Sequence, residues 1–366
     1  MDQRVREHAD VLVDWSARID AGDDVVVAVS EGSHDLAVAV CEALGERGAN
    51  YVAVYDSDEI ERAYRRAHDG EFDEDPGFEL SLYEEADAVL RLGRGRNTAA
   101  QADVAGETRQ AHRTARTGIR EARMDTDWVS TVHPTRSLAQ QAGMSVEAYR
   151  EFVYDAVLRD WESLADEMAK TKELLDEGSE VRIETGEQAV EMRIDGRTAV
   201  NSAASVAYDS HNLPSGEVFT APYATEGEIT FDVPMTVNSR RVRDATLTFE
   251  DGEVVDVSAA QGEQALRDVL DTDPGARRLG ELGIGMNRGI DRVTDNILFD
   301  EKMGDTVHLA VGRSYGACLP DGETGNESAV HTDLICDVSE DSRILVDGEV
   351  IQQNGKFRWE EGFESA

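Results

Sequence analysis

The sequence predicts an α/β N-terminal domain with a doubly wound, mostly parallel sheet, followed by an α+β metal-binding domain rich in antiparallel strands. In the first half of the chain, continuous apolar runs alternate with helical patterns. In the second half, short strands of alternating polar and apolar residues are separated by Asp-Gly and Glu-Gly turns. A length of 366 residues exceeds one typical domain, so two domains are expected.

The first half opens with apolar residues at helical spacing and then alternates between short apolar strands and helices. The expected helices include residues 5–19, 34–47 and 99–115, and the expected strands are residues 25–29, 51–55, 86–92 and 128–132. Strands that are apolar throughout are buried on both faces, which is typical of a parallel sheet covered by helices.

A long helical pattern over residues 145–177 separates the two halves. Ser145 suits the N-cap of this helix, and Gly178 follows its last apolar positions. We therefore divide the chain into an α/β domain of residues 1–178 and an α+β catalytic metal-binding domain of residues 179–366. The second domain has one further expected helix near residues 263–271.

Four short segments of the second domain each carry a carboxylate or an imidazole within an apolar or glycine-rich strand. The candidate metal ligands are Glu217, Glu281, His308, His331 and Asp333. Because successive strand side chains point to opposite faces, Glu281 shares its face with Gly283 and Gly285, and glycine lets a bulky ligand or ion come close. A single histidine or acidic residue is more often structural or solvated. Five such groups in apolar surroundings favour a cation, because an unpaired buried charge is costly.

Several stretches of the second half form a recognisable series: residues 212–222 (NLPSGEVFTAP), 279–281 (LGE), 308–315 (HLAVGRSY) and 331–334 (HTDL), with closing segments at residues 346–351 and 355–357. In order and approximate spacing they resemble the aminopeptidase T and aminopeptidase S family of dinuclear metallopeptidases. The likeness is specific between residues 180 and 358 and looser before that.

The resemblance implies that the five candidates hold two divalent ions, with Glu281 bridging them, and that Tyr315 lines the site. It also implies a homodimer whose active sites face an enclosed cavity, with the N-terminal domain restricting entry to small peptides. The chain departs from the family in a short connection between Tyr315 and His331 and in its acidic composition. Those departures leave the candidate ligands in place and bear on substrate range.

The residue types themselves fit peptide hydrolysis. Three carboxylates and two imidazoles suit Zn, Co or Mn, and two such ions polarise a carbonyl and lower the pKa of bound water to around 7. We therefore predict a metallo-aminopeptidase with two divalent ions per chain, which removes N-terminal residues from peptides through a metal-activated water. Tyr315 and Glu281 are the predicted catalytic residues: the tyrosine donates a hydrogen bond to the developing oxyanion, and a carboxylate of the site carries the proton.

Two other functions are compatible with the sequence. A mononuclear iron ring-cleaving dioxygenase of the dihydroxypyridine dioxygenase type needs only two histidines and one carboxylate, here His308, His331 and Asp333. The two glutamates argue against it, because they supply ligands for a second metal. A non-catalytic acidic binding protein would instead pair the five groups with arginines such as Arg288, Arg292 and Arg313.

The chain is strongly acidic. It has 76 Asp and Glu against 36 Lys and Arg, a formal net charge of −40 and a pI near 4.4. Concentrated salt screens such repulsion, so the composition predicts a halophilic, haloarchaeal-type protein. A polyanion should bind neither nucleic acid nor anionic membranes. Three cysteines without metal-type spacing, and the absence of an apolar signal core or a 20-residue apolar stretch, predict a cytoplasmic protein.

Overall fold

The computed structural model describes residues 2–93, 97, 99–238 and 240–364, which form two compact units. Unit 1 comprises Met1–Arg159 and Ala204–Pro214, and unit 2 comprises Asp160–Ala203 and Ser215–Ala366. The chain thus passes from unit 1 to unit 2 at residue 160, whereas the expected boundary lies after residue 178. A short stretch of the predicted second domain also returns to unit 1.

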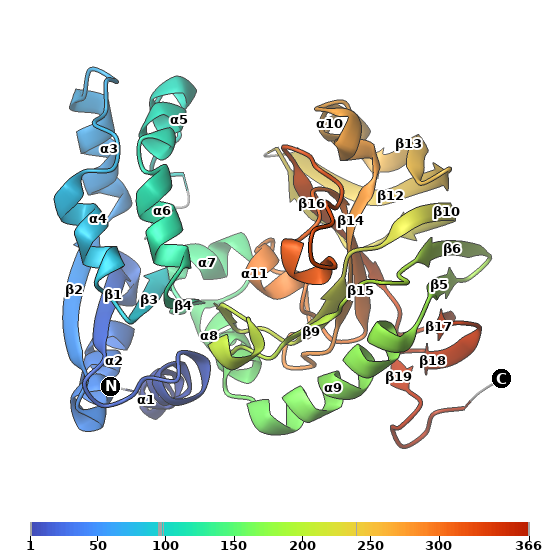
Figure 1. The fold of residues 1–366 in the computed structure, drawn as a ribbon, viewed down its shortest axis with the longest axis horizontal. Helices are drawn as coiled ribbons and strands as arrows, with labels where there is room; N and C mark the ends of the chain where they lie inside the picture. The colour runs from blue at the N-terminus through green and yellow to red at the C-terminus, as the bar shows by residue number, and fades with distance from the viewer. Residues whose placement is uncertain (1, 94–96, 98, 239, 365–366) are drawn as a thin grey trace. The chain divides into compact units, whose positions relative to one another are not determined.

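Unit 1 is built on a parallel sheet of five strands flanked by helices, as predicted (Figure 1). The strand order is β2-β1-β3-β4-β8, in which β1 (Asp24–Ser30) pairs in parallel with both β2 (Asn50–Asp56) and β3 (Ala88–Gly93). Strand β4 (Asp127–Val132) extends the sheet, and β8 (Asn212–Leu213), from the returning stretch, completes it. The continuous apolar runs β1 and β3 occupy the interior of the sheet, as such runs require.

The helices of unit 1 are α1 (Gln3–Asp10), α2 (His34–Arg47), α3 (Asp58–Ala67), α4 (Gly77–Glu84), α5 (Gly106–Thr114), α6 (Thr117–Met124), α7 (Arg136–Gln141) and α8 (Val146–Val157). Ser145 caps α8, because its hydroxyl accepts a hydrogen bond from the amide of Ala148 at 3.1 Å. The helical pattern over residues 145–177 forms two helices, since α9 (Trp161–Glu177) starts afresh in unit 2 with Asp160 as its N-cap.

Unit 2 contains two largely antiparallel sheets. The larger has the order β11-β12-β10-β6-β5-β17-β18-β19, with β13 paired to β12, and the smaller has the order β16-β15-β14-β9-β7. The strands of the larger sheet are β5 (Glu180–Thr185), β6 (Gln188–Arg193), β10 (Tyr223–Phe231), β11 (Met235–Val237), β12 (Arg240–Glu250), β13 (Glu253–Gln261), β17 (Ser342–Val346), β18 (Glu349–Gln353) and β19 (Lys356–Phe357).

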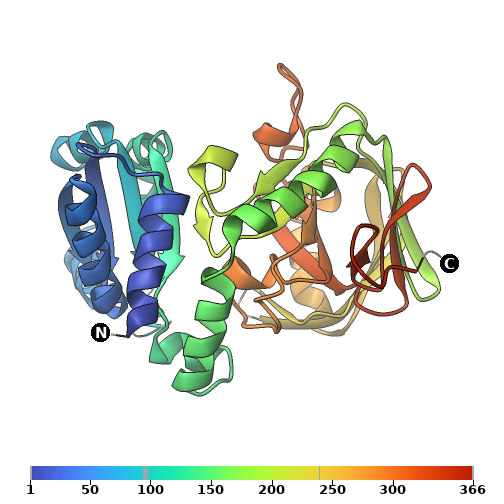
Figure 2. The same cartoon turned by 90° about the horizontal axis from the view of Figure 1, so that it is seen from below.

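The smaller sheet carries all five candidate metal ligands. Its strands are β7 (Val200–Ser202), β9 (Glu217–Thr220), β14 (Leu279–Gly285), β15 (Thr306–Gly312) and β16 (His331–Asp337). Helix α9, the long light-green helix near the centre of Figure 2, packs against β7 and β9, and every residue of β14 and β15 is buried. Two short helices, α10 (Glu263–Leu270) and α11 (Ile297–Asp300), complete the unit. Among the described residues, no helix is both long and apolar enough to cross a bilayer.

Candidate metal centre

Three adjacent strands of the smaller sheet bring three of the five candidate ligands onto one face. Ala310 of β15 pairs with Glu281 of β14 on one side and with Asp333 of β16 on the other. Two residues further along β15, Gly312 pairs with His331. Paired residues of neighbouring strands point to the same face, so the carboxylates and the imidazole gather over two small residues of β15. The alternation read from the sequence is confirmed for these strands.

His308 and Glu217 join the same face from β15 and β9. His308 of β15 pairs with Gly283 of β14, and Glu217 of β9 pairs with Gly285 of the same strand. The imidazole of His308 lies over the backbone of Gly283 so closely that a Cβ there would sit 2.0 Å from the ring's Cε1. Glycine is therefore required beneath this histidine: the sequence predicts room for a ligand or ion on this face, and at Gly283 the imidazole of His308 occupies that room.

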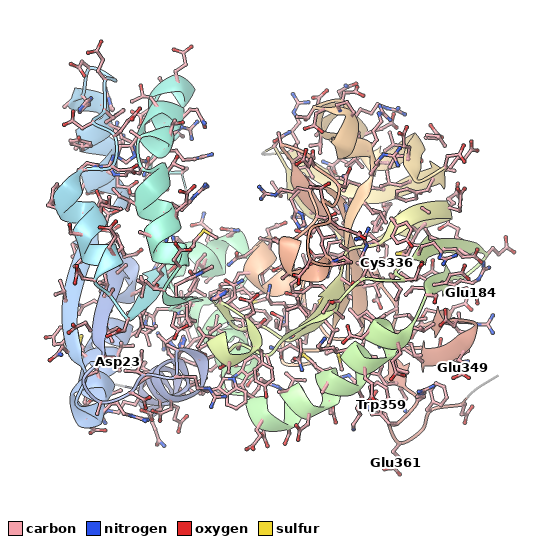
Figure 3. The ribbon with its side chains drawn as sticks, viewed as in Figure 1. Asp23, Glu184, Cys336, Glu349, Trp359 and Glu361 are labelled. Carbon is pink, nitrogen blue, oxygen red and sulfur yellow. The ribbon has the colours of Figure 1, made fainter. Side chains whose placement is uncertain are left out.

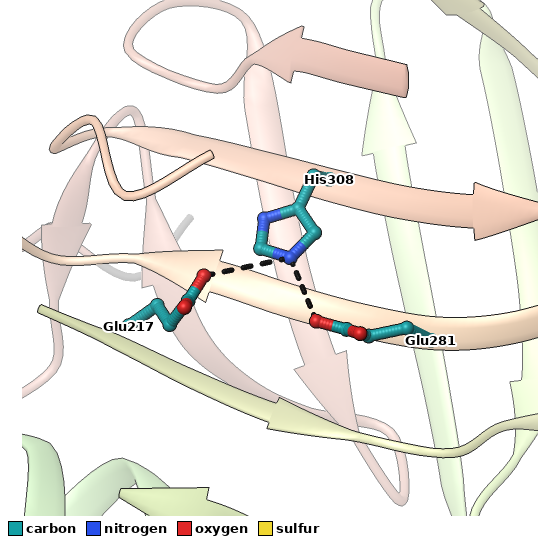
Figure 4. A group of neighbouring side chains, drawn as sticks. All are labelled: Glu217, Glu281 and His308. Carbon is teal, nitrogen blue, oxygen red and sulfur yellow. Dashed lines mark hydrogen bonds and ion pairs between the residues drawn. The ribbon is translucent and has the colours of Figure 1, made fainter. Parts of the chain in front are cut away.

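Glu217, Glu281 and His308 form a first buried group (Figure 4). The Nε2 atom of His308 lies 3.1 Å from Oε1 of Glu281 and 3.6 Å from Oε2 of Glu217. Within the group, one ligand atom from each residue lies within 4.8 Å of the others. That spacing lets all three coordinate a single ion.

Glu281, His331 and Asp333 form a second group that shares Glu281 with the first. The Nε2 atom of His331 lies 3.3 Å from Oε2 of Glu281 and 3.5 Å from Oδ1 of Asp333. On the other side of the ring, Nδ1 donates a hydrogen bond of 2.8 Å to the backbone carbonyl of Arg313. A carbonyl oxygen only accepts, so this bond leaves Nε2 of the neutral ring with the lone pair that a metal needs.

The site attracts positive charge strongly. Burial lowers the pKa of His308, but its hydrogen bond to Glu281 and the charge of Glu217 raise that pKa overall, to about 9. Burial likewise opposes the protonation of His331, yet Asp333 and Glu281 raise its pKa to about 11. Both histidines in turn hold the pKa of Glu281 below its usual value despite burial. A divalent cation bound among these carboxylates would balance their negative charge in place of the protons on the two histidines.

The residues present fit a divalent metal. The Oε2 atoms of Glu217 and Glu281 are buried and lack a hydrogen-bond partner among the described residues. Buried carboxylate oxygens without a hydrogen bond cost free energy, and coordination to a cation would remove that cost. Carboxylates with imidazoles are the ligand set of zinc, cobalt and manganese sites.

Two further charged residues lie at the site, Glu301 and Lys302, and the strand pattern of the sequence does not point to them. Lys302 is only 1% exposed; its ammonium lies 3.3 Å from Oε1 of Glu217 and forms a second ion pair with Glu301. Burial lowers the pKa of Lys302, but Glu217 and Glu301 raise it overall. Burial raises the pKa of Glu301 to about 8, against the pull of Lys302. A lysine in a chain that has only four was the available signal.

Tyr315 follows β15 and lies beside the second group. Its ring meets that of His331 edge-on, with centroids 4.9 Å apart, and lies 5.7 Å from that of Phe219. The residue is 44% exposed, so it lines an accessible side of the centre. Burial of its hydroxyl, together with the charges of Glu281 and Asp333, raises the pKa of Tyr315. The phenol therefore stays protonated and able to donate a hydrogen bond.

The geometry disfavours both alternative functions. The two histidines needed for a mononuclear iron site fall in different ligand groups. Arg288 pairs with Asp305 and Glu360, and Arg292 pairs with Asp291. In the described part of the chain, no ion pair joins an arginine to any of the five candidate ligands.

Comparisons with known proteins identify a metalloprotease family and relatives named as aminopeptidases. The profile of the family described as thermophilic metalloprotease (M29) matches residues 1–357. Aminopeptidase 2 of Geobacillus stearothermophilus is 39% identical over 140 residues, which are 34% of this chain and 33% of that protein. Aminopeptidase T of Thermus aquaticus is 36% identical over 163 residues, 40% of each chain. The matched segments thus span only a third to two fifths of these relatives.

The fold also matches a solved structure. Wild-type AmpT from Thermus thermophilus superposes with a TM-score of 0.84 at 24% sequence identity, covering 97% of this chain and 99% of that one. The likeness establishes a common fold for both units of the chain.

Proposed function

Because this chain belongs to the thermophilic metalloprotease (M29) family, we propose that it is a metal-dependent aminopeptidase, which removes N-terminal residues from peptides. The observation that carries the proposal is the pair of adjoining ligand groups that share Glu281. We infer two divalent ions per chain, of zinc, cobalt or manganese, with Glu281 bridging them.

Each residue has a distinct role in this mechanism. Glu217 and His308 would hold one ion, His331 and Asp333 would hold the other, and Glu281 would contribute to both. When bound, such ions would supply a Lewis acid for the carbonyl of the first peptide bond and a water whose pKa is lowered to about 7. A carboxylate of the site, with Glu281 as the candidate, accepts the proton of the attacking water and delivers it to the leaving amine.

Metal analysis combined with a substrate screen tests the function. The protein, purified in concentrated KCl, is expected to contain two divalent ions per chain and to release free amino acids from short peptides and aminoacyl-arylamides. Removal of the ions with a chelator should abolish the release, and added zinc, cobalt or manganese should restore it. Peptides with a blocked N-terminus serve as the matched control and should remain intact.

Other outcomes would select an alternative. One iron per chain together with oxygen uptake would identify a dioxygenase. A protein that binds no divalent ion tightly, and whose unfolding temperature does not change with a chelator, would be a non-catalytic binding protein.

Tyr315→Phe tests the proposed oxyanion donor. Its side chain lies beside His331 and its phenol stays protonated. Loss of the hydroxyl should lower kcat by roughly two orders of magnitude, the usual effect of removing one oxyanion donor. The metal content, measured by elemental analysis, should stay at the wild-type value. Loss of metal in this variant would mean that Tyr315 supports the site structurally.

We also propose that the enzyme works in the cytoplasm of a halophile. The carboxylates of Glu349 and Glu361 are exposed on unit 2 (Figure 3), and the whole chain carries a formal net charge of −40. All three cysteines are free thiols, which supports a reducing compartment. Charges repel over about 30 Å at 0.01 M salt but over only about 3 Å at 1 M. Dialysis to low salt should therefore unfold the protein, as followed by circular dichroism; full activity in dilute buffer would contradict the proposal.

A homodimer is the proposed assembly. It rests on the resemblance to the aminopeptidase T and aminopeptidase S family, and the proposed partners are peptide substrates and a second copy of the chain. Light scattering in concentrated KCl measures the mass directly, and a value near 40.1 kDa would indicate a monomer.

A further inference from the structure

Lys302 forms a direct, buried ion pair with a ligand of only one of the two groups in the described part of the chain. Its ammonium lies 3.3 Å from Oε1 of Glu217, and its other ion pair goes to Glu301. Among the described residues, no ion pair links Lys302 to His331 or Asp333. The first group must therefore share a carboxylate with a cation that is already in direct contact with it, whereas the second group feels the same charge only at longer range, through Asp333.

The formal charges of the centre favour the binding of one divalent ion over the binding of two. The carboxylates of the two ligand groups are Glu217, Glu281 and Asp333, and the ammonium beside them is Lys302. With neutral histidines, these groups carry two negative charges. One divalent ion balances them, and a second ion gives the centre two positive charges. Without the lysine, two divalent ions would leave one positive charge, so the lysine disfavours full loading.

We propose that Lys302 weakens the ion position formed by Glu217, Glu281 and His308, and that the position formed by Glu281, His331 and Asp333 is the tighter one. The inference rests on the two-ion centre of the proposed function. It assigns Lys302 as a positioning residue that sets metal loading.

Lys302 also orients Glu217, and this second effect should strengthen metal binding rather than weaken it. Partners that orient a ligand typically strengthen metal binding by about 10- to 100-fold. The electrostatic effect should outweigh this gain, because both charges are buried and the repulsion grows with the double charge of the ion. Lys302 is 1% exposed, so water screens the ammonium poorly.

Lys302→Met tests the sign, since methionine keeps the length of the side chain without its charge. Metal-free protein is titrated with Zn²⁺ by calorimetry in concentrated KCl. The weaker dissociation constant should decrease about tenfold or more, and the tighter one should stay within about threefold. Lys356→Met, at an exposed lysine of the same unit, is the matched control and should change neither constant.

Glu301→Gln provides a second variant with the opposite expectation, and it decides the question if the Lys302 variant loses its wild-type circular dichroism. The side chain of Glu301 is 19% exposed and pairs with Lys302. Above the pKa of Glu301, which burial raises to about 8, the substitution removes one negative charge and leaves the ammonium to Glu217 alone, so the weaker constant measured there should increase several-fold.

Clear results would overturn the inference. Equal affinities at both positions of the wild-type protein would do so, as would weaker or unchanged Zn²⁺ binding in the Lys302 variant. The proposed function fails separately: unequal binding of two ions without release of amino acids would keep the role of Lys302 and reject the aminopeptidase. Amino acid release by a protein with two equal positions would do the reverse.

Discussion

Glu281→Gln is expected to release at least one ion per chain and to lower kcat/KM by about three orders of magnitude or more. Glu281 is the single residue that belongs to both ligand groups, and it is only 4% exposed. Its Oε1 atom lies 3.1 Å from Nε2 of His308, and its Oε2 atom lies 3.3 Å from Nε2 of His331. Glutamine keeps the shape, but it replaces one ligand oxygen with an NH₂ group that cannot coordinate a cation and removes a negative charge.

The metal content of the Glu281 variant, measured by elemental analysis, separates loss of the ion from loss of the fold. Glu349→Gln makes the same chemical change where the side chain is 79% exposed, so it should leave metal content and rate unchanged. Wild-type rates and two ions per chain in the Glu281 variant would remove this residue from the centre.

Gly283→Ala is the second prediction with a large expected effect, and it adds a single methyl group. A Cβ at this position would lie 2.0 Å from Cε1 and 2.1 Å from Nε2 of His308. Strand β14 is hydrogen-bonded on both sides, with Gly283 paired to His308 and to Phe219, so the backbone cannot retreat. The imidazole must therefore rotate away from Glu217 and Glu281, which removes one ligand from the first group.

The expected result is weaker binding of one ion and a loss of turnover of about 10²-fold or more, with a decrease in stability of about 1–3 kcal/mol from overpacking. Calorimetric titration with Zn²⁺ and thermal unfolding in concentrated KCl measure the two effects separately. Gly45→Ala is the control, because a Cβ there meets nothing within 4 Å and lies within helix α2. An unchanged zinc affinity in the Gly283 variant would show that His308 does not need this glycine.

Side-chain alternation along single strands was enough to choose the candidate ligands. In β14 and β15, the polar residue shares a face with glycine or alanine, and the apolar residues point the other way. That pattern is local, because the two faces of a strand are set by the backbone of the strand itself. The five candidate ligands could be chosen without knowing which strands are neighbours.

The fold class followed from local patterns for the same reason. Strands that are apolar throughout predicted the parallel sheet of unit 1, and alternating strands with tight turns predicted the antiparallel sheets of unit 2. The patterns did not reveal that residues 212–213 add a strand to unit 1, or that the helical stretch restarts after Asp160. Both features depend on where distant segments pack.

Tertiary structure alone decided how the charges are shared. Glu281 belongs to both ligand groups because the register between β14, β15 and β16 aligns it with Ala310 and Asp333. Lys302 reaches Glu217 from a loop 85 positions away, and no periodicity relates the two residues. Backbone alternation acts over two residues, whereas ion pairs and metal sites join side chains that only strand pairing and loop packing bring within a few ångströms.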